Sequence, residues 1–119
     1  MKKIVLVVDD EADVRRFLTA VLEKHGYEIV IAEDGMTALE IARKEKPDLV
    51  TLDLHMPHGT GTDFYRKFTR SHDYADTPII IVSGLAGREL AVKKPVAVFD
   101  KPIDPDEFIA AVRSALHED

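Results

Sequence analysis

Acidic, hydroxyl and basic side chains stand directly after four separate apolar runs of this chain. The pair Asp9-Asp10 closes the first run, Asp53 and Ser83 end two later ones, and Lys101 follows the last. Three carboxylates brought together repel one another unless a cation joins them, and oxygen-only ligands suit a hard cation such as Mg²⁺. A carboxylate beside Mg²⁺ is a candidate nucleophile toward phosphorus and would form an aspartyl phosphate. The metal and the lysine would then neutralise the phosphoryl oxygens, and the serine could donate a hydrogen bond to one of them.

These groups can meet only if the apolar runs are strands of one sheet. Helical patterns with apolar spacings of three and four separate the runs, so strand alternates with helix along the chain. This order predicts a five-stranded, doubly wound parallel sheet with helices on both faces, the flavodoxin-like α/β arrangement. Ligands of such sheets bind beyond the carboxyl ends of the strands. We expect strands at 4–8, 27–32, 48–54, 78–82 and 96–99, with helices around 14–22, 36–42, 64–68 and 105–116.

The segment between the last two strands departs from this regularity. Between Leu85 and Pro95 only Leu90, Ala91 and Val92 are apolar, and two lysines precede the proline. We therefore expect the fourth helix to be short or irregular.

Length and composition narrow the functional classes. The 119 residues suit one domain spanning 1–119. Lysine plus arginine is 16 against 22 for aspartate plus glutamate, a net charge of −6 that argues against direct nucleic-acid binding. No cysteine is present, which excludes disulfide and thiolate chemistry. The run Ile4–Val8 is too short for a signal peptide or a membrane span, so we interpret the protein as cytoplasmic.

Each motif also has an ordinary structural explanation. Paired acids after a strand are often helix caps, and a single Asp at a strand end is often a turn residue. Ser83-Gly84 alone indicates a turn, and Lys101 alone would be a solvated charge. The functional interpretation depends on convergence, because four strands present suitable groups at the same edge of the sheet.

Together these residues resemble the receiver domain of bacterial two-component response regulators, over nearly the whole chain. The matching pieces are Asp9-Asp10, the run 53–57 (Asp-Leu-His-Met-Pro) followed by Gly61, then Ser83, and finally Lys101-Pro102. The stretch 32–35 (Ala-Glu-Asp-Gly) with Ala38-Leu39 also looks like the family's second strand-to-helix junction.

The resemblance implies a role for each acidic residue. Asp53 would be the phosphoacceptor. Asp10 and Asp53 would bind Mg²⁺ directly, the backbone carbonyl of His55 would add a third protein ligand, and Asp9 would act largely through water.

The resemblance also implies how the phosphoryl group is recognised. Lys101 would pair with it, and Ser83 would move toward it and report its presence. The Lys101–Pro102 peptide bond is typically cis in this family.

Two departures from the family pattern concern the surface that family members use for output. The position three residues before the lysine is usually aromatic, but here it is Val98. Phe99 lies one residue later and is expected in the core on the opposite face of the strand. The stretch between Ser83 and Lys101 is also shorter than usual. We therefore transfer the phosphorylation chemistry more readily than the docking or dimerisation surface, and a homodimer remains open.

These features favour a switchable binding module over an enzyme. The phosphoryl donor would be a histidine kinase or a phosphotransfer protein, and the output a changed affinity for a downstream protein partner or effector domain. The chain ends soon after Leu116, so it is either a stand-alone receiver or part of something longer.

Two alternatives stay open. A phosphatase or phosphotransferase acting through aspartyl phosphate would want a second Asp where His55 stands, and usually a cap domain as well. A degenerate receiver would bind partners without being phosphorylated. Nucleotide-binding glycine motifs are absent from the sequence.

Overall fold

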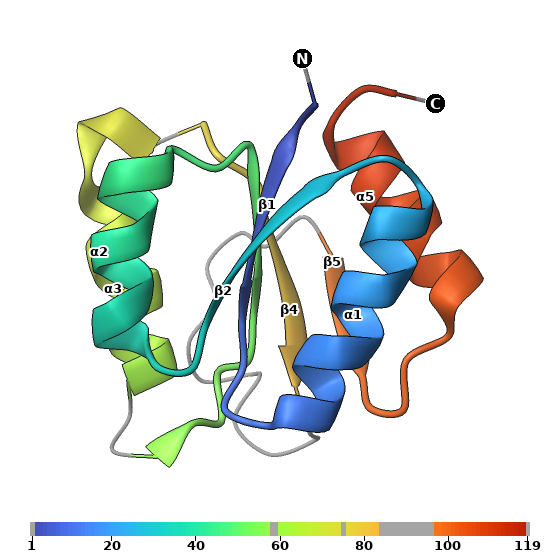
Figure 1. Ribbon diagram of the computed structural model, residues 1–119. Coiled ribbons are helices and arrows are strands. Elements are labelled where there is room, and N and C mark those ends of the chain that lie inside the picture. The colour runs from blue at the N-terminus through green and yellow to red at the C-terminus, as the bar shows by residue number, and fades with distance from the viewer. Residues whose placement is uncertain (1, 58–59, 75, 84–96, 119) are drawn as a thin grey trace.

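Five parallel strands form one sheet in the order β2-β1-β3-β4-β5 (Figure 1). The computed structural model describes residues 2–57, 60–74, 76–83 and 97–118. The sequence order of the strands reverses between β1 and β3, which both lie inside the sheet, so the predicted doubly wound topology is confirmed. The strands are β1 (Ile4–Val8), β2 (Glu28–Ala32), β3 (Leu49–Leu52), β4 (Ile79–Ser83) and β5 (Ala97–Asp100).

Helices cover both faces of the sheet. Figure 1 shows α2 and α3 on one face and α1 and α5 on the other. The predicted fourth helix, at 85–95, lies outside the described residues. A short 3-10 turn at His72–Tyr74, which the sequence pattern does not predict, follows α3. The helices are α1 (Ala12–Lys24), α2 (Gly35–Glu45), α3 (Thr60–Arg70) and α5 (Pro105–Ala115).

The strands are apolar on both faces because each face contributes to a separate core. In β1, Leu6 and Val8 pack with the helices α2 and α3, whereas Val5 and Val7 belong to the cluster beneath α1 and α5. Successive side chains of a strand point to opposite faces of the sheet, so alternate residues of β1 enter different cores. Both sets are apolar, which is why such a strand appears in the sequence as a continuous apolar run.

Side chains and backbone geometry set the helix ends. Asp34 caps α2 by accepting a 2.8 Å hydrogen bond from the Thr37 amide, and this bond lowers the pKa of the Asp34 carboxyl. Asp104 accepts bonds from the amides of residues 106 and 107, and Pro105 opens α5 as predicted. These caps satisfy amide groups that have no partner inside the helix.

The structure corrects one boundary that matters for the site. β3 ends at Leu52, not at residue 54. Asp53 therefore lies just beyond the last sheet residue, so the alternation of side chains between the two faces of the strand does not set the direction of its side chain. Phe99, which the sequence places in the core, is partly buried and packs against the core, where its ring lies edge-on to Phe108 with centroids 6.0 Å apart.

None of the helices within the described ranges is both long and apolar enough to cross a membrane.

The core beneath α1 and α5 supplies a first prediction. Phe108 is fully buried, and replacing it with alanine should lower the free energy of unfolding by about 3–5 kcal/mol through lost burial and a residual cavity. Phe17 is 39% exposed, so Phe17→Ala should cost less than about 1 kcal/mol. Urea denaturation followed by far-UV circular dichroism measures both. Similar losses in the two variants would contradict this account of the core.

Candidate functional site

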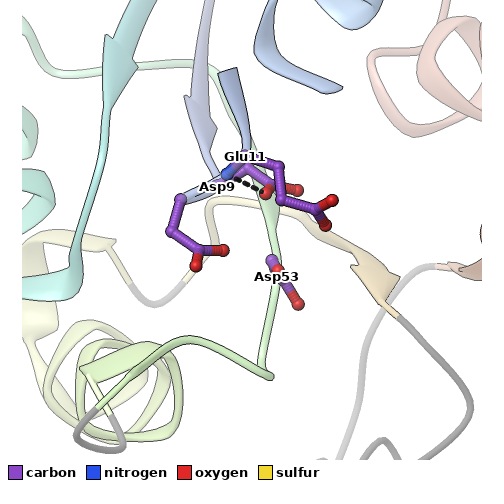
Figure 2. A group of neighbouring side chains, drawn as sticks. Asp9, Glu11 and Asp53 are labelled. Carbon is purple, nitrogen blue, oxygen red and sulfur yellow. Dashed lines mark hydrogen bonds between the residues drawn. The ribbon is translucent and has the colours of Figure 1, made fainter. Parts of the chain in front are cut away.

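The sheet register brings the first acidic residue next to the third strand's acid. Val8 pairs with Leu52 in the parallel ladder between β1 and β3, so the next residues, Asp9 and Asp53, leave the sheet side by side. The Asp53 amide still donates to the Val8 carbonyl at 3.0 Å. Figure 2 shows both side chains at this edge, together with Glu11.

Asp9 is a buried carboxylate held by its own loop. Its Oδ1 accepts a 2.9 Å hydrogen bond from the Glu11 amide, and its Oδ2 lies 3.2 Å from the Lys101 ammonium. Arg15, on α1, donates a 2.8 Å hydrogen bond to the Asp9 backbone carbonyl. The side chain and the backbone of this residue are therefore both fixed before any ligand binds.

Asp53 is buried as well, and its two carboxylate oxygens have different partners. Oδ1 accepts a 2.9 Å hydrogen bond from the His55 amide, and Oδ2 lies 3.3 Å from Lys101 Nζ. Gly61 packs directly against this backbone. A Cβ atom at residue 61 would lie 2.9 Å from Leu54 Cα and closer still to the Asp53 carbonyl oxygen. Only glycine leaves room there for the loop that carries Asp53.

Lys101 is the cation of the site. Its Nζ lies 2.6 Å from Glu11 Oε1 in addition to its contacts with Asp9 and Asp53. Burial lowers the pKa of this ammonium, but the bond to Glu11 and the charges of the two aspartates outweigh burial and raise it. Lys101 therefore stays charged.

Burial has the opposite consequence for Asp9. Removal from water raises the pKa of this carboxyl to about 6, and the nearby Asp53 charge adds to the effect. The Glu11 amide and Lys101 oppose the shift without cancelling it. An additional cation at this position would be strongly favoured.

The donor set fits a hard divalent ion. Asp9, Asp10, Glu11 and Asp53 can each offer one carboxylate oxygen, and these atoms all lie within 4.8 Å of one another. Asp9 Oδ2 is buried yet receives no well-oriented hydrogen bond from the described residues. Oxygen atoms alone, with a buried anionic oxygen among them, suit Mg²⁺ or Ca²⁺ better than a soft metal.

Most of the residues singled out from the sequence do lie together. Asp9, Asp10, Asp53 and Lys101 converge at one edge, and the Lys101–Pro102 bond is cis. His55 contributes its backbone, since its amide donates to Asp53 while its side chain is exposed.

Two of those residues are described only in their backbone. Ser83 ends β4 opposite Asp100, and Val98 pairs with Ile81. Their side chains, and with them the Ser83 hydroxyl, lie outside what the structure describes.

Glu11 is the site residue that the sequence interpretation missed. Its only sequence signal is that it extends the acidic pair to three consecutive acids, 9–11. An exposed glutamate at the start of a helix is ordinary, because negative charge is favourable there. What distinguishes Glu11 from such an ordinary glutamate is the contact between its carboxylate and Lys101.

Comparisons with known proteins agree on one family. Residues 5–113 match the model of the response regulator receiver domain. The chain is 40% identical over 119 residues to the protein PilH of Pseudomonas aeruginosa, covering 94% of this chain and 96% of that one. It is 34% identical over 112 residues to the protein Rrf1 of Nitratidesulfovibrio vulgaris, covering 94% and 81%.

Other relatives are longer, and solved structures share the fold. The phosphate regulon transcriptional regulatory protein PhoB of Escherichia coli is 31% identical, and the match covers 98% of this chain but 52% of that protein. The chain thus spans about half the length of some curated relatives. The chemotaxis protein CheY4 of Vibrio cholerae superposes with a TM-score of 0.87 at 29% identity, covering 98% of this chain and 100% of that one.

The close approach of Gly61 gives a prediction. Gly61→Ala should lower the free energy of unfolding by about 1–3 kcal/mol, because the added methyl group must displace the backbone of residues 53–54. In ¹H–¹⁵N NMR spectra the amide signals of residues 53–55 should therefore shift.

The matched control is Gly26→Ala. Gly26 has φ of +90° and nothing within 4 Å of an added Cβ, so the variant is strained but stays remote from the site. Unchanged signals at 53–55 in Gly61→Ala would show that the site backbone tolerates a side chain at residue 61.

The buried Asp9 carboxyl gives a pH-dependent prediction. Its pKa in the folded protein, about 6, lies above the ordinary value of 3.8, so the folded state binds more protons between these values. Without divalent metal, this carboxyl should therefore lower the free energy of unfolding as pH rises from 4 to 6. Asp9→Asn removes the effect and should be more stable than wild type at pH 7, by about 2–3 kcal/mol, but not at pH 4.

Urea denaturation in EDTA across this pH range measures the difference. Glu33→Gln, at an exposed acid that follows β2, should run parallel to wild type. An Asp9→Asn curve that is also parallel to wild type would contradict the assigned cost of burying Asp9.

Proposed function

This chain belongs to the response regulator receiver domain family, and we propose on that basis that Asp53 is the residue that accepts the phosphoryl group. Receiver domains of this family are phosphorylation-dependent signalling switches of two-component systems. The observation that carries the proposal is the buried Asp53 carboxylate, whose Oδ2 lies 3.3 Å from Lys101 in an otherwise acidic site.

The transfer needs no group on the protein other than this carboxylate as nucleophile. One Asp53 oxygen attacks the phosphorus of a phosphohistidine on the donor, forming a new P–O bond. The P–N bond breaks, and its electron pair stays on the imidazole nitrogen, which is then protonated. Lys101 donates hydrogen bonds to the transferring oxygens and balances the charge they carry.

The acidic residues would hold Mg²⁺. Asp10 and Asp53 are the proposed direct ligands, together with the backbone carbonyl of His55, and Asp9 acts largely through water. The ion would neutralise part of the negative charge on the phosphoryl oxygens and would thereby weaken the repulsion between these oxygens and the carboxylates. The cluster of oxygen donors and the unsatisfied Asp9 Oδ2 support this assignment.

The switch follows from the charge that the reaction adds. A phosphoryl group carries about one and a half to two negative charges and replaces the single charge of the carboxylate, so it adds about a half to one negative charge, together with three acceptor oxygens, to a site that already holds several acids. Lys101 must reorganise toward it, and the Ser83 hydroxyl is the proposed second donor. Ser83 ends β4 and Lys101 directly follows β5, so movement of these residues can change how the surface formed by β5 and α5 binds.

The partners follow from the same chemistry. The donor is a histidine kinase or a histidine-containing phosphotransfer protein, and a downstream protein or a covalently attached effector domain reads the result. In this proposal the domain is a signalling module, not an enzyme that turns over a separate substrate, and it assists only its own phosphorylation and dephosphorylation.

Intact-mass spectrometry tests the acceptor. Wild type incubated with acetyl phosphate and MgCl₂ should gain the mass of one phosphoryl group, whereas EDTA should abolish the gain. Asp53→Asn should gain nothing, because an amide is a poor nucleophile toward phosphorus.

The matched control is Glu33→Gln, which removes one exposed acid at the same edge of the sheet and should be modified like wild type. An adduct of equal yield on Asp53→Asn would reject Asp53 as the acceptor. An adduct on wild type that persists in EDTA would reject the role of the metal.

A further inference from the structure

Glu11 occupies the position of a helix cap without capping the helix. It immediately precedes α1, yet its side chain makes no capping hydrogen bond with the described residues. Its Oε1 instead lies 2.6 Å from Lys101 Nζ, a partner 90 residues away in the sequence. Figure 2 shows the Glu11 side chain beside Asp9 on the loop that follows β1. The Glu11 side chain thus contacts Lys101 across the site and does not cap its own helix.

This contact is one of three that hold the lysine. Lys101 Nζ donates hydrogen bonds to Glu11 Oε1 and to Asp53 Oδ2, and it forms an ion pair with Asp9 Oδ2 at 3.2 Å. The shortest of the three distances is the one to Glu11. Phosphorylation would convert the Asp53 carboxylate into an acyl phosphate, whose charged oxygens lie beyond the present position of that carboxylate. To follow these oxygens, Lys101 would have to move away from its contacts with Asp9 or Glu11.

The two carboxylates that remain, those of Asp9 and Glu11, differ in what loss of the ammonium would cost. The Asp9 side chain is 1% exposed, so loss of the ammonium would leave an uncompensated charge away from water. The Glu11 side chain is 58% exposed, and water can replace the ammonium there. Glu11 is therefore the partner that Lys101 gives up.

We propose that Glu11 is a positioning residue, which holds the Lys101 ammonium in the unphosphorylated protein and is displaced when Asp53 is phosphorylated. The inference rests on the proposed function of Asp53 and Lys101. Glu11 competes with the phosphoryl group for one N–H donor and so biases the switch toward its unphosphorylated state. Glu11 thus sets how strongly the phosphoryl group must attract Lys101 before the lysine moves. Glu11 does not itself contact the transferred group.

Binding of beryllofluoride with MgCl₂ provides an equilibrium test, because this complex occupies an aspartyl carboxylate as a phosphoryl analogue. Isothermal titration should show that Glu11→Gln binds it about three- to fivefold more tightly than wild type, the size expected for loss of one exposed ion pair. Mg²⁺ affinity is titrated separately without beryllofluoride, and beryllofluoride is then titrated at saturating MgCl₂, so that a change in metal binding does not enter the comparison.

A double-mutant cycle separates the contact with Lys101 from the general loss of a negative charge. In the Lys101→Met background, Glu11→Gln should leave beryllofluoride affinity unchanged. Glu33→Gln, which removes a more exposed acid of the same edge, should match wild type. An equal gain in the Lys101→Met background, or in Glu33→Gln, would overturn the proposal, because simple repulsion would then explain the gain. Weaker binding of beryllofluoride by Glu11→Gln at saturating MgCl₂ would also overturn it, since Glu11 would then support the bound phosphoryl analogue and would not compete with it.

A second measurement keeps the inference testable if wild type binds no beryllofluoride, a result that would count against the proposed function alone. Limited acetylation with acetic anhydride in EDTA, followed by peptide mass mapping, reports how firmly Lys101 is held. Lys101 should be acetylated several times faster in Glu11→Gln than in wild type, with Lys24 as the internal reference. An unchanged relative rate would overturn the role of Glu11 in any event.

Discussion

The arrangement of this site depends on one ammonium group, that of Lys101, which contacts the acids that follow two different strands. Asp9 and Asp53 are buried next to each other, and two like charges removed from water would be strongly destabilising without compensation. Lys101, which follows the distant β5, lies within 3.3 Å of both. This edge of the sheet can hold several acids in the folded protein because Lys101, which follows the fifth strand, places a positive charge beside the ends of the first and third strands.

Compensation by the lysine is incomplete. One charge cannot neutralise all the carboxylates that converge there, and burial, with a smaller contribution from the Asp53 charge, raises the pKa of Asp9 to about 6. In the proposed function, a divalent cation would offset these charges, whereas a phosphoryl group would add negative charge again. Each event would change the partners of Lys101 and would thereby couple the metal, the phosphoryl group and the position of the lysine.

The surrounding fold keeps these groups at fixed distances. The register of β1 with β3 sets the spacing of their acids, and the backbone at residues 53–54 lies so close to Gly61 that no side chain fits there. A similar approach occurs where Gly35, at the start of α2, meets the backbone of Thr60 at the start of α3. Two packed cores, one on each face, hold the strands from which the site residues project. The exposed Glu11 is less constrained, which suits a residue that exchanges its partner.

The sequence by itself determined the fold and most of the site. Alternating apolar runs and helical patterns leave a parallel sheet as the arrangement that buries both faces of each strand, and the carboxyl ends of such strands must meet at one edge. The positions of Asp53 and Lys101 follow from that rule, as does their proximity. The tertiary structure alone decided which of three consecutive acids is buried, and that the Glu11 carboxylate accepts a hydrogen bond from Lys101 and not from an amide of its own helix. Local patterns cannot reveal this, because the direction of a side chain in a turn depends on packing against segments far away in the sequence.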